Sequence, residues 1–123
     1  MEDIMPELNV ERFGDVAMIE CERLIVQGEA AHRLRNAVMA NAGLATMVLD
    51  FSEVEAIEEE GLGMLAYLQL WAFARDIRLK LFNPSKRVLA RIERACLHDW
   101  QIASLDELTA LLKVAGEHYT IAA

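Results

Sequence analysis

The chain has 123 residues and a formal net charge of −8, and hydrophobic residues make up 54% of it. A chain of this length can bury its own core as one domain, so we expect a single domain over residues 1–123 with its core at about 8–115. The negative charge argues against nucleic acid and anionic membrane surfaces, because both attract basic faces. Its apolar runs are shorter than the roughly 20 residues that span a bilayer, so no membrane insertion is expected.

The two cysteines, Cys21 and Cys96, are far apart in sequence and lie in no metal or redox motif. Free thiols are typical of cytoplasmic proteins, and the first ten residues lack the basic and apolar stretches of a signal peptide. Glu29 and His32 are one helical turn apart, a spacing found in some metal sites, but no second pair accompanies them. We therefore predict a cytoplasmic protein without a cofactor or a bound metal.

The first expected elements are two short strands, near residues 8–12 and 16–21. Phe13-Gly14-Asp15 between them has the composition of a hairpin turn. A helix is predicted over about 29–42, because its apolar residues recur at three- and four-residue spacing. Gly43 follows this helix and is expected to be its left-handed cap.

Strands and helices alternate through the rest of the chain. Ser104 and Glu107 have the spacing of a capping box, which marks the start of the final helix, and Gly116 is expected to end that helix. The further elements are expected at 46–51 (buried strand), about 61–75 (helix), 77–82 (strand), 83–95 (helix), 100–103 (short strand) and 104–116 (helix).

This order of elements predicts an α/β fold. Strands joined by helices form right-handed crossovers, so we expect a mixed, mostly parallel sheet of four to five strands with an antiparallel N-terminal hairpin and about four helices. Loops that follow parallel strands cluster at one end of the sheet, where ligands or partners usually bind. Glu58, Glu59 and Glu60 are predicted to lie at that end.

Residues 48–65, VLDFSEVEAIEEEGLGML, resemble the central signature of the STAS domain, the fold of bacterial anti-sigma-factor antagonists. In that family an apolar strand ends in Asp and is followed by Asp-Ser-Ser-Gly-Leu-Gly or Asp-Ser-Thr-Gly-Leu-Gly. Leu49-Asp50 matches the strand end, and Gly61-Leu62-Gly63 matches the helix start. The similarity continues through the strand and turn at 79–88, and Cys96-Leu97 stands in the usual place of a Gly-Leu pair.

The three glutamates are where this chain departs from the family. The resemblance aligns Glu58 with the motif Asp, Glu59 with the Ser that a partner anti-sigma factor phosphorylates, and Glu60 with the second Ser or Thr. In the family, phosphorylation abolishes binding to the anti-sigma factor. Glutamate carries part of the charge of phosphoserine. Glu59 is therefore expected to act as a constitutive phosphomimic or to remove the switch, while Ser52 and Ser85 stay open as other phosphorylation sites.

Two other interpretations of the glutamates need no switch. Carboxylates at a helix start stabilise the helix, because the helix dipole favours anions there. Paired carboxylates can also act as acid and base in a small enzyme. No Ser-His-Asp arrangement, phosphate-binding loop or metal signature accompanies Glu58 to Glu60, so the enzyme is the weaker alternative.

The helix after the glutamates, GLGMLAYLQLWAFA at 61–74, is apolar on nearly every side. If Leu65, Leu68 and Trp71 face the sheet, then Leu70 and Phe73 point away from it. Other helices could cover that outer face. Otherwise it is a docking patch of a kind that monomers rarely leave exposed, and we expect it beside the glutamates.

These observations predict a non-catalytic STAS regulatory or adaptor domain. The resemblance implies a protein partner, either a kinase-like anti-sigma factor or, as in related small STAS subunits of phospholipid transport, an ABC-type ATPase. A homodimer is a further possibility, and nucleotide binding is disfavoured because the acidic loop would repel phosphates. The residues predicted to bind the partner are Glu58, Glu59, Glu60, Gly61, Leu62, Leu70, Phe73 and Ser85.

Overall fold

The computed structural model describes residues 8–25, 28–95 and 100–122, with side chains as far as Lys113. After the first three strands, one or two strands stand between successive helices. The elements are β1 (Val10–Phe13), β2 (Val16–Glu20), β3 (Leu24–Ile25), α1 (Gly28–Met39), β4 (Thr46–Asp50), β5 (Ala56–Ile57), α2 (Glu59–Ala74), β6 (Arg78–Phe82), α3 (Lys86–Arg94), β7 (Gln101–Ala103) and α4 (Leu105–Ala122).

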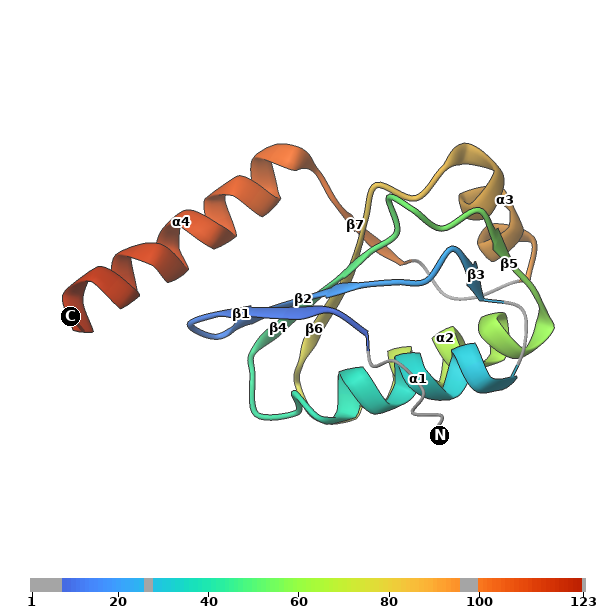
Figure 1. The fold of residues 1–123 in the computed structure, drawn as a ribbon, viewed down its shortest axis with the longest axis horizontal. Helices are drawn as coiled ribbons and strands as arrows, with labels where there is room; N and C mark the ends of the chain where they lie inside the picture. The colour runs from blue at the N-terminus through green and yellow to red at the C-terminus, as the bar shows by residue number, and fades with distance from the viewer. Residues whose placement is uncertain (1–7, 26–27, 96–99, 123) are drawn as a thin grey trace, which may run out of the picture.

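The main sheet has five strands in the order β1-β2-β4-β6-β7 (Figure 1). β1 and β2 form an antiparallel hairpin around Gly14, whose φ of 58° is the positive value that a tight turn requires. The other neighbours, β2 with β4, β4 with β6 and β6 with β7, pair in parallel. The predicted mixed, mostly parallel sheet with an antiparallel hairpin and four helices is confirmed.

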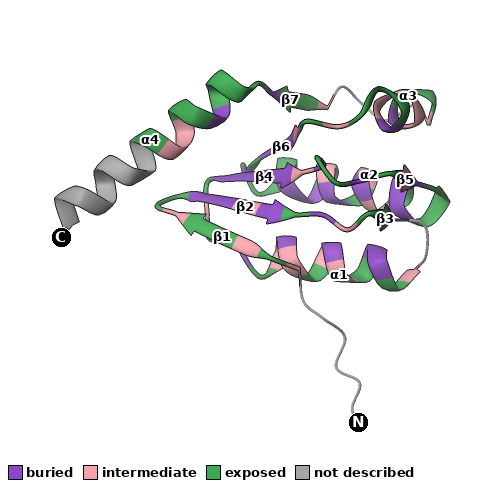
Figure 2. Cartoon of the chain, turned by 45° about the horizontal axis from the view of Figure 1, so that its top comes forward, coloured by how far each residue is buried: buried purple, intermediate pink, exposed green. Residues whose placement is uncertain are grey.

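The core fills the face of the sheet that α1 and α2 cover, and Figure 2 shows their buried sides turned toward the strands. Ile19, Leu49 and Leu81 from the central strands meet Leu34 of α1 and Leu65 of α2, all of them fully or almost fully buried. Side chains alternate along a strand, so every second residue points to this face and the residues between them point to the other face. Both faces are covered, which explains why the central strand β4 is a continuous apolar run.

The other face is covered in part by the first half of α4. Leu108 packs there with Val16 and Val48. The predicted capping box that starts the helix is confirmed: the Glu107 amide donates to Ser104 Oγ at 3.0 Å, and the Ser104 amide donates to Glu107 Oε1 at 3.2 Å. Lys80 Nζ, 3.1 Å away, and the Ser104 amide both hold the pKa of the Glu107 carboxyl below its ordinary value.

Several predicted boundaries were wrong. α4 does not end at Gly116 but continues to Ala122. α1 ends at Met39, and Gly43 lies in the turn that follows without a positive φ, so it is not a left-handed cap. The predicted helix ran on to residue 42 because the spacing of apolar residues continues into this turn. Over three residues, that spacing does not distinguish a helical turn from a tight turn.

A second, two-stranded sheet was also missed. β3 and β5 pair in parallel, with Leu24 opposite Ala56 and Ile25 opposite Ile57. Runs of two residues carry too little periodicity to be recognised as strands. This pair connects the segment before α1 to the segment before α2, at the end of the main sheet where Figure 1 shows α3.

Cys21 is buried and free. Burial raises the pKa of its thiol, and the nearby Asp50 carboxylate acts in the same direction. A thiol held in its neutral form is a poor nucleophile, so Cys21 behaves as a small apolar core residue. Cys96 lies outside the described residues.

Candidate functional site

The candidate site is the N-terminal end of α2, at the carboxyl end of the sheet (Figure 1). β5 leads directly into Glu58, whose amide donates to the Ile25 carbonyl of the β3 segment at 3.2 Å. The Glu58 carbonyl then accepts the first helical bond, from the Leu62 amide at 2.8 Å. The small β3–β5 sheet therefore fixes where α2 begins, and the helix starts at Glu59, two residues earlier than predicted.

Gly61 and Leu62 face the protein interior at this site. A Cβ on Gly61 would lie 2.2 Å from the Ile25 carbonyl oxygen, so only glycine lets α2 approach β3 so closely. Leu62 is 6% exposed and belongs to the main core. The Gly-Leu part of the motif is therefore needed for packing, and neither residue has a side chain that a partner could reach.

The three glutamates diverge from one another. Glu58 extends toward α3, where its Oε1 accepts a bond from Arg91 Nη2 at 2.7 Å. Glu60 turns toward the start of α1, and its carboxylate oxygen would lie 3.2 Å from a Cβ on Gly28. Glu59 is exposed and has no hydrogen bond or ion pair to any described residue. Glu60 is also exposed and also lacks a hydrogen bond or ion pair to any described residue, so Glu59 and Glu60 are both available to another molecule.

The helix end is favourable for a negative charge. Glu58 occupies the N-cap position in extended conformation, but its side chain makes no capping hydrogen bond because it is turned to Arg91. The first amides of α2 thus lack a side-chain acceptor from the N-cap residue. A carboxylate at such a position gains about 0.3–1 kcal/mol from the helix dipole. This contribution accounts for a glutamate at position 59 but does not require one there.

Ser52 lies in the loop after β4 and is exposed. Its hydroxyl donates to Asp50 Oδ1 at 2.6 Å, and Asn83 Nδ2 donates to the hydroxyl at 3.3 Å. Asn83 takes a left-handed conformation, with φ of 56°, at the end of β6. The cluster ties together the ends of two neighbouring strands. A phosphate on Ser52 would meet the Asp50 carboxylate, which makes Ser52 a poor candidate for phosphorylation.

Ser85, which was predicted to contact a partner, is the N-cap of α3. Its Oγ accepts a hydrogen bond from the Val88 amide at 3.1 Å. Ser85→Ala is expected to lower the free energy of unfolding by about 1 kcal/mol, because the cap is lost. Ser85→Asp keeps an acceptor and should stay close to wild type. Urea unfolding of wild type and the two variants measures these free energies. An equal loss of stability in both variants would show that the loss does not come from removing the capping acceptor.

The outer face of α2 is uncovered among the described residues. Tyr67, Leu70 and Phe73 are 48%, 65% and 84% exposed, as the predicted helix orientation requires. The prediction that they lie beside the glutamates is wrong. A helix rises 1.5 Å per residue, so Leu70 and Phe73 are roughly 16–21 Å along the axis from Glu59. The acidic end and this apolar patch are two separate surfaces.

Three arginines near the site were not predicted to have a role. Arg87, Arg91 and Arg94 of α3 line a groove together with Glu55 and Glu58. Their spacing in KRVLARIER, at i, i+4 and i+7, places basic residues on one side of a helix and could have indicated a basic face.

Neither a metal centre nor a membrane span is found among the described residues. No group of three or more histidine, cysteine, aspartate or glutamate side chains there could hold a metal ion, and the pair Glu29 and His32 has no further ligand. None of the helices in that part of the chain combines the length and the hydropathy needed to cross a bilayer.

Comparison with known proteins identifies the family. The STAS domain family matches residues 8–110. The unphosphorylated anti-sigma factor antagonist SpoIIAA aligns with a TM-score of 0.70 and 18% identity, over 89% of this chain and 96% of that one. A Thermotoga maritima protein described as an anti-sigma factor antagonist aligns with a TM-score of 0.71 and 19% identity, over 86% and 94%. No curated protein sequence matches the chain.

A membrane transporter contains the same fold. The murine solute carrier 26 family member A9 anion transporter aligns with a TM-score of 0.63 and 18% identity, over 85% of this chain and 18% of the transporter. The chain belongs to the STAS domain family, a family of regulatory, non-enzymatic domains. At these identities the solved structures establish the fold and leave the partner open.

Proposed function

We propose that this chain is a non-catalytic STAS regulatory domain with the protein-binding end of an anti-sigma-factor antagonist. We further propose that Glu59 fixes this end in a phosphorylated-like state, in which it binds a kinase-like anti-sigma factor only weakly. The observation that carries the proposal is the position of Glu59. It is the exposed first residue of α2 and has no hydrogen bond or ion pair to a described residue, whereas Glu58 pairs with Arg91. Glu60 is also exposed and unpaired there, but its carboxylate is directed toward Gly28 at the start of α1. The proposed location is the cytoplasm.

The relatives support a role for charge at this site. SpoIIAA of Bacillus has been solved in a phosphorylated and in an unphosphorylated form. Phosphoserine carries about −1.5 to −2 charges and three acceptor oxygens, whereas glutamate carries one charge and two oxygens. Glu59 therefore supplies part of the charge permanently, at the helix end where the motif of the family places its Ser.

The same geometry supports the absence of catalysis. An acid–base pair requires two carboxylates that face one substrate atom. Glu58 is directed toward Arg91 of α3, and Glu60 toward Gly28 of α1. The three therefore do not converge on one point, and we propose that their function is recognition.

Capture of partners from the native host tests the proposal. Tagged wild type and Glu59→Ser serve as the two baits, because they differ only in the charge at the proposed switch position. We expect a kinase-like anti-sigma factor to be enriched on the Glu59→Ser bait and much less on wild type. Enrichment of an ABC-type transport ATPase, equally on both baits, would contradict the proposal and favour the transport alternative.

The apolar patch of Tyr67, Leu70 and Phe73 makes a separate prediction. Exposed apolar surface of this kind favours self-association or docking. The double substitution Leu70→Ser and Phe73→Ser should leave the unfolding free energy within about 0.5 kcal/mol of wild type, because both side chains are exposed. Sedimentation at rising concentration should show wild type associating and the variant staying monomeric. A wild type that is monomeric throughout would exclude a homodimer through this patch.

A further inference from the structure

A groove of about 380 Å³ lies between β5 and α3. One wall is the segment from Glu55 to Glu58, and the other wall is α3, which Figures 1 and 2 both show beside β5. Three side chains on the α3 wall are arginines, and the lining also includes Val88 and Ile57. The groove is thus basic along one wall, in a chain whose net charge is −8.

The charges in the groove do not cancel. Arg91 Nη2 lies 2.7 Å from Glu58 Oε1, and both residues line the groove. Glu55 Oε2 lies 3.4 Å from Arg23 Nε, which is not part of the lining. Each acidic side chain of the lining therefore already has an arginine of its own. Arg87 is exposed and has no ion pair within the described part of the chain. The positive charge of Arg87 is therefore not neutralised within the groove, and it can attract an anionic ligand.

The spacing of the arginines favours an extended ligand. Along the axis of α3, Arg87 and Arg91 are about 6 Å apart and Arg87 and Arg94 about 10.5 Å apart, from the rise of 1.5 Å per residue. An extended peptide advances roughly 3.3 Å per residue, so carboxylates two and three residues apart would match these positions. Guanidinium groups also hold carboxylates through paired hydrogen bonds. A compact anion such as phosphate would reach only part of the row.

We propose that this groove binds an acidic peptide segment of a protein partner and that Glu58 occupies part of it when the partner is absent. The Glu58 and Arg91 side chains are 51% and 33% exposed. Ion pairs with this exposure are weak, so a partner carboxylate can replace Glu58 on Arg91. The net negative charge of the chain does not prevent this, because salt screens charges more than about 8 Å away at physiological ionic strength.

The inference goes beyond the proposed function. It concerns the chemistry of the ligand at the α3 wall, and it holds whether or not Glu59 determines which partner binds. An antagonist that bound its partner through the acidic end alone would leave the arginines of α3 without a role in recognition.

A peptide titration tests the inference. The probe is a fluorescein-labelled peptide with four consecutive glutamates between glycine and serine, and its control has glutamines at the same positions. Fluorescence polarisation with the full chain should show binding of the first peptide only. Arg87→Gln should weaken binding at least fivefold. Glu58→Gln should strengthen it about threefold, because the internal competitor for Arg91 is removed.

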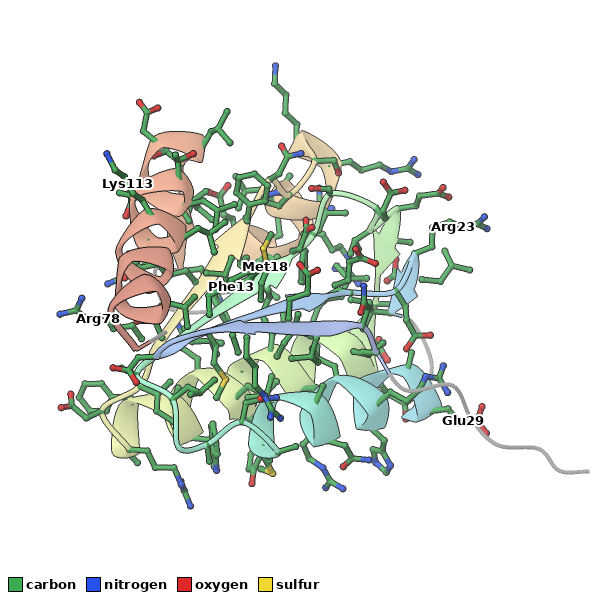
Figure 3. All side chains as sticks on the ribbon, turned by 60° about the vertical axis from the view of Figure 1, so that its left-hand side comes forward. Phe13, Met18, Arg23, Glu29, Arg78 and Lys113 are labelled. Atoms are coloured by element: carbon green, nitrogen blue, oxygen red, sulfur yellow. The ribbon has the colours of Figure 1, made fainter. Side chains whose placement is uncertain are left out.

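Arg78→Gln is the matched control, because it changes the net charge by the same amount as Arg87→Gln. Arg78 is exposed at the start of β6, and Figure 3 shows it on the opposite side of the molecule from Arg23. It should change binding less than twofold. Equal weakening by Arg78→Gln and Arg87→Gln would overturn the proposal, because binding would then follow overall charge.

Two further results would overturn it. If Glu58→Gln does not strengthen binding, Glu58 does not compete for the groove. If pyrophosphate, or a single-stranded oligonucleotide, displaces the peptide at a lower concentration than the unlabelled peptide does, the groove is a phosphate site. Chemical-shift changes in 15N-labelled protein should be centred on residues 86–94, and their absence there would also contradict the assignment.

Discussion

Gly61→Ala is expected to lower the free energy of unfolding by about 3 kcal/mol, because it forces a close-packed backbone apart. The new Cβ would lie 2.2 Å from the Ile25 carbonyl oxygen and 2.9 Å from side-chain carbons of Ile25 and Ile57. The oxygen belongs to the backbone, which cannot move aside as a flexible side chain can. α2 would have to shift away from the β3–β5 sheet and from the core that it covers.

Gly63→Ala provides the control two residues further along the same helix. A Cβ on Gly63 would meet nothing within 4 Å. Alanine is favoured over glycine inside a helix by about 0.5–1 kcal/mol, so this variant should be more stable than wild type. Urea unfolding measures both changes. Similar effects of the two substitutions would mean that helix propensity, and not the contact with Ile25, determines the role of Gly61.

The elements that could be predicted well are those marked by a local sequence pattern. The β1–β2 hairpin was located by Gly14, and the central strand by the continuous apolar run from Thr46 to Asp50. The start of α4 was located by the capping box of Ser104 and Glu107, which the hydrogen bonds confirm. In each case the local chemistry and the tertiary structure favour the same conformation.

The parts that were missed depend on contacts between distant segments. β3 and β5 have two residues each and exist as strands only because they pair with each other. No local pattern specifies this pairing. It nevertheless determines where α2 begins, so the start of the helix was predicted two residues late.

The placement of the three glutamates at a helix start could be predicted, but the directions of their side chains could not. The sequence places Glu58, Glu59 and Glu60 at a helix start after a parallel strand, and the structure agrees. It cannot tell that Glu58 is held by Arg91, which is 33 residues away along the chain. Nor did it show that Leu62 is part of the core. Side-chain direction follows from tertiary contacts, which a single sequence does not display.

Glu59→Ser is expected to increase the affinity for a kinase-like anti-sigma factor at least tenfold, or about 1.4 kcal/mol. The resemblance to the antagonists implies that a negative group at this position prevents binding. Serine removes the charge and restores the hydroxyl of the family motif. The folded state should change little, because Glu59 is exposed and makes no hydrogen bond or ion pair with the described residues.

Glu60→Ser is the matched control, because it removes the same charge from the neighbouring residue. The Glu60 carboxylate lies over Gly28 and is directed toward α1. Its removal should change the affinity less than threefold. An equal gain from both substitutions would indicate a general effect of net charge, and the special position of Glu59 would lose its support.

Calorimetric titration of wild type, Glu59→Ser and Glu60→Ser with the anti-sigma factor captured from the host tests the role of Glu59 most directly. We predict weak or undetectable binding by wild type and by Glu60→Ser. We predict clear binding by Glu59→Ser, which is lost once the introduced serine is phosphorylated. Tight binding by wild type, at the affinity of Glu59→Ser, would contradict the account.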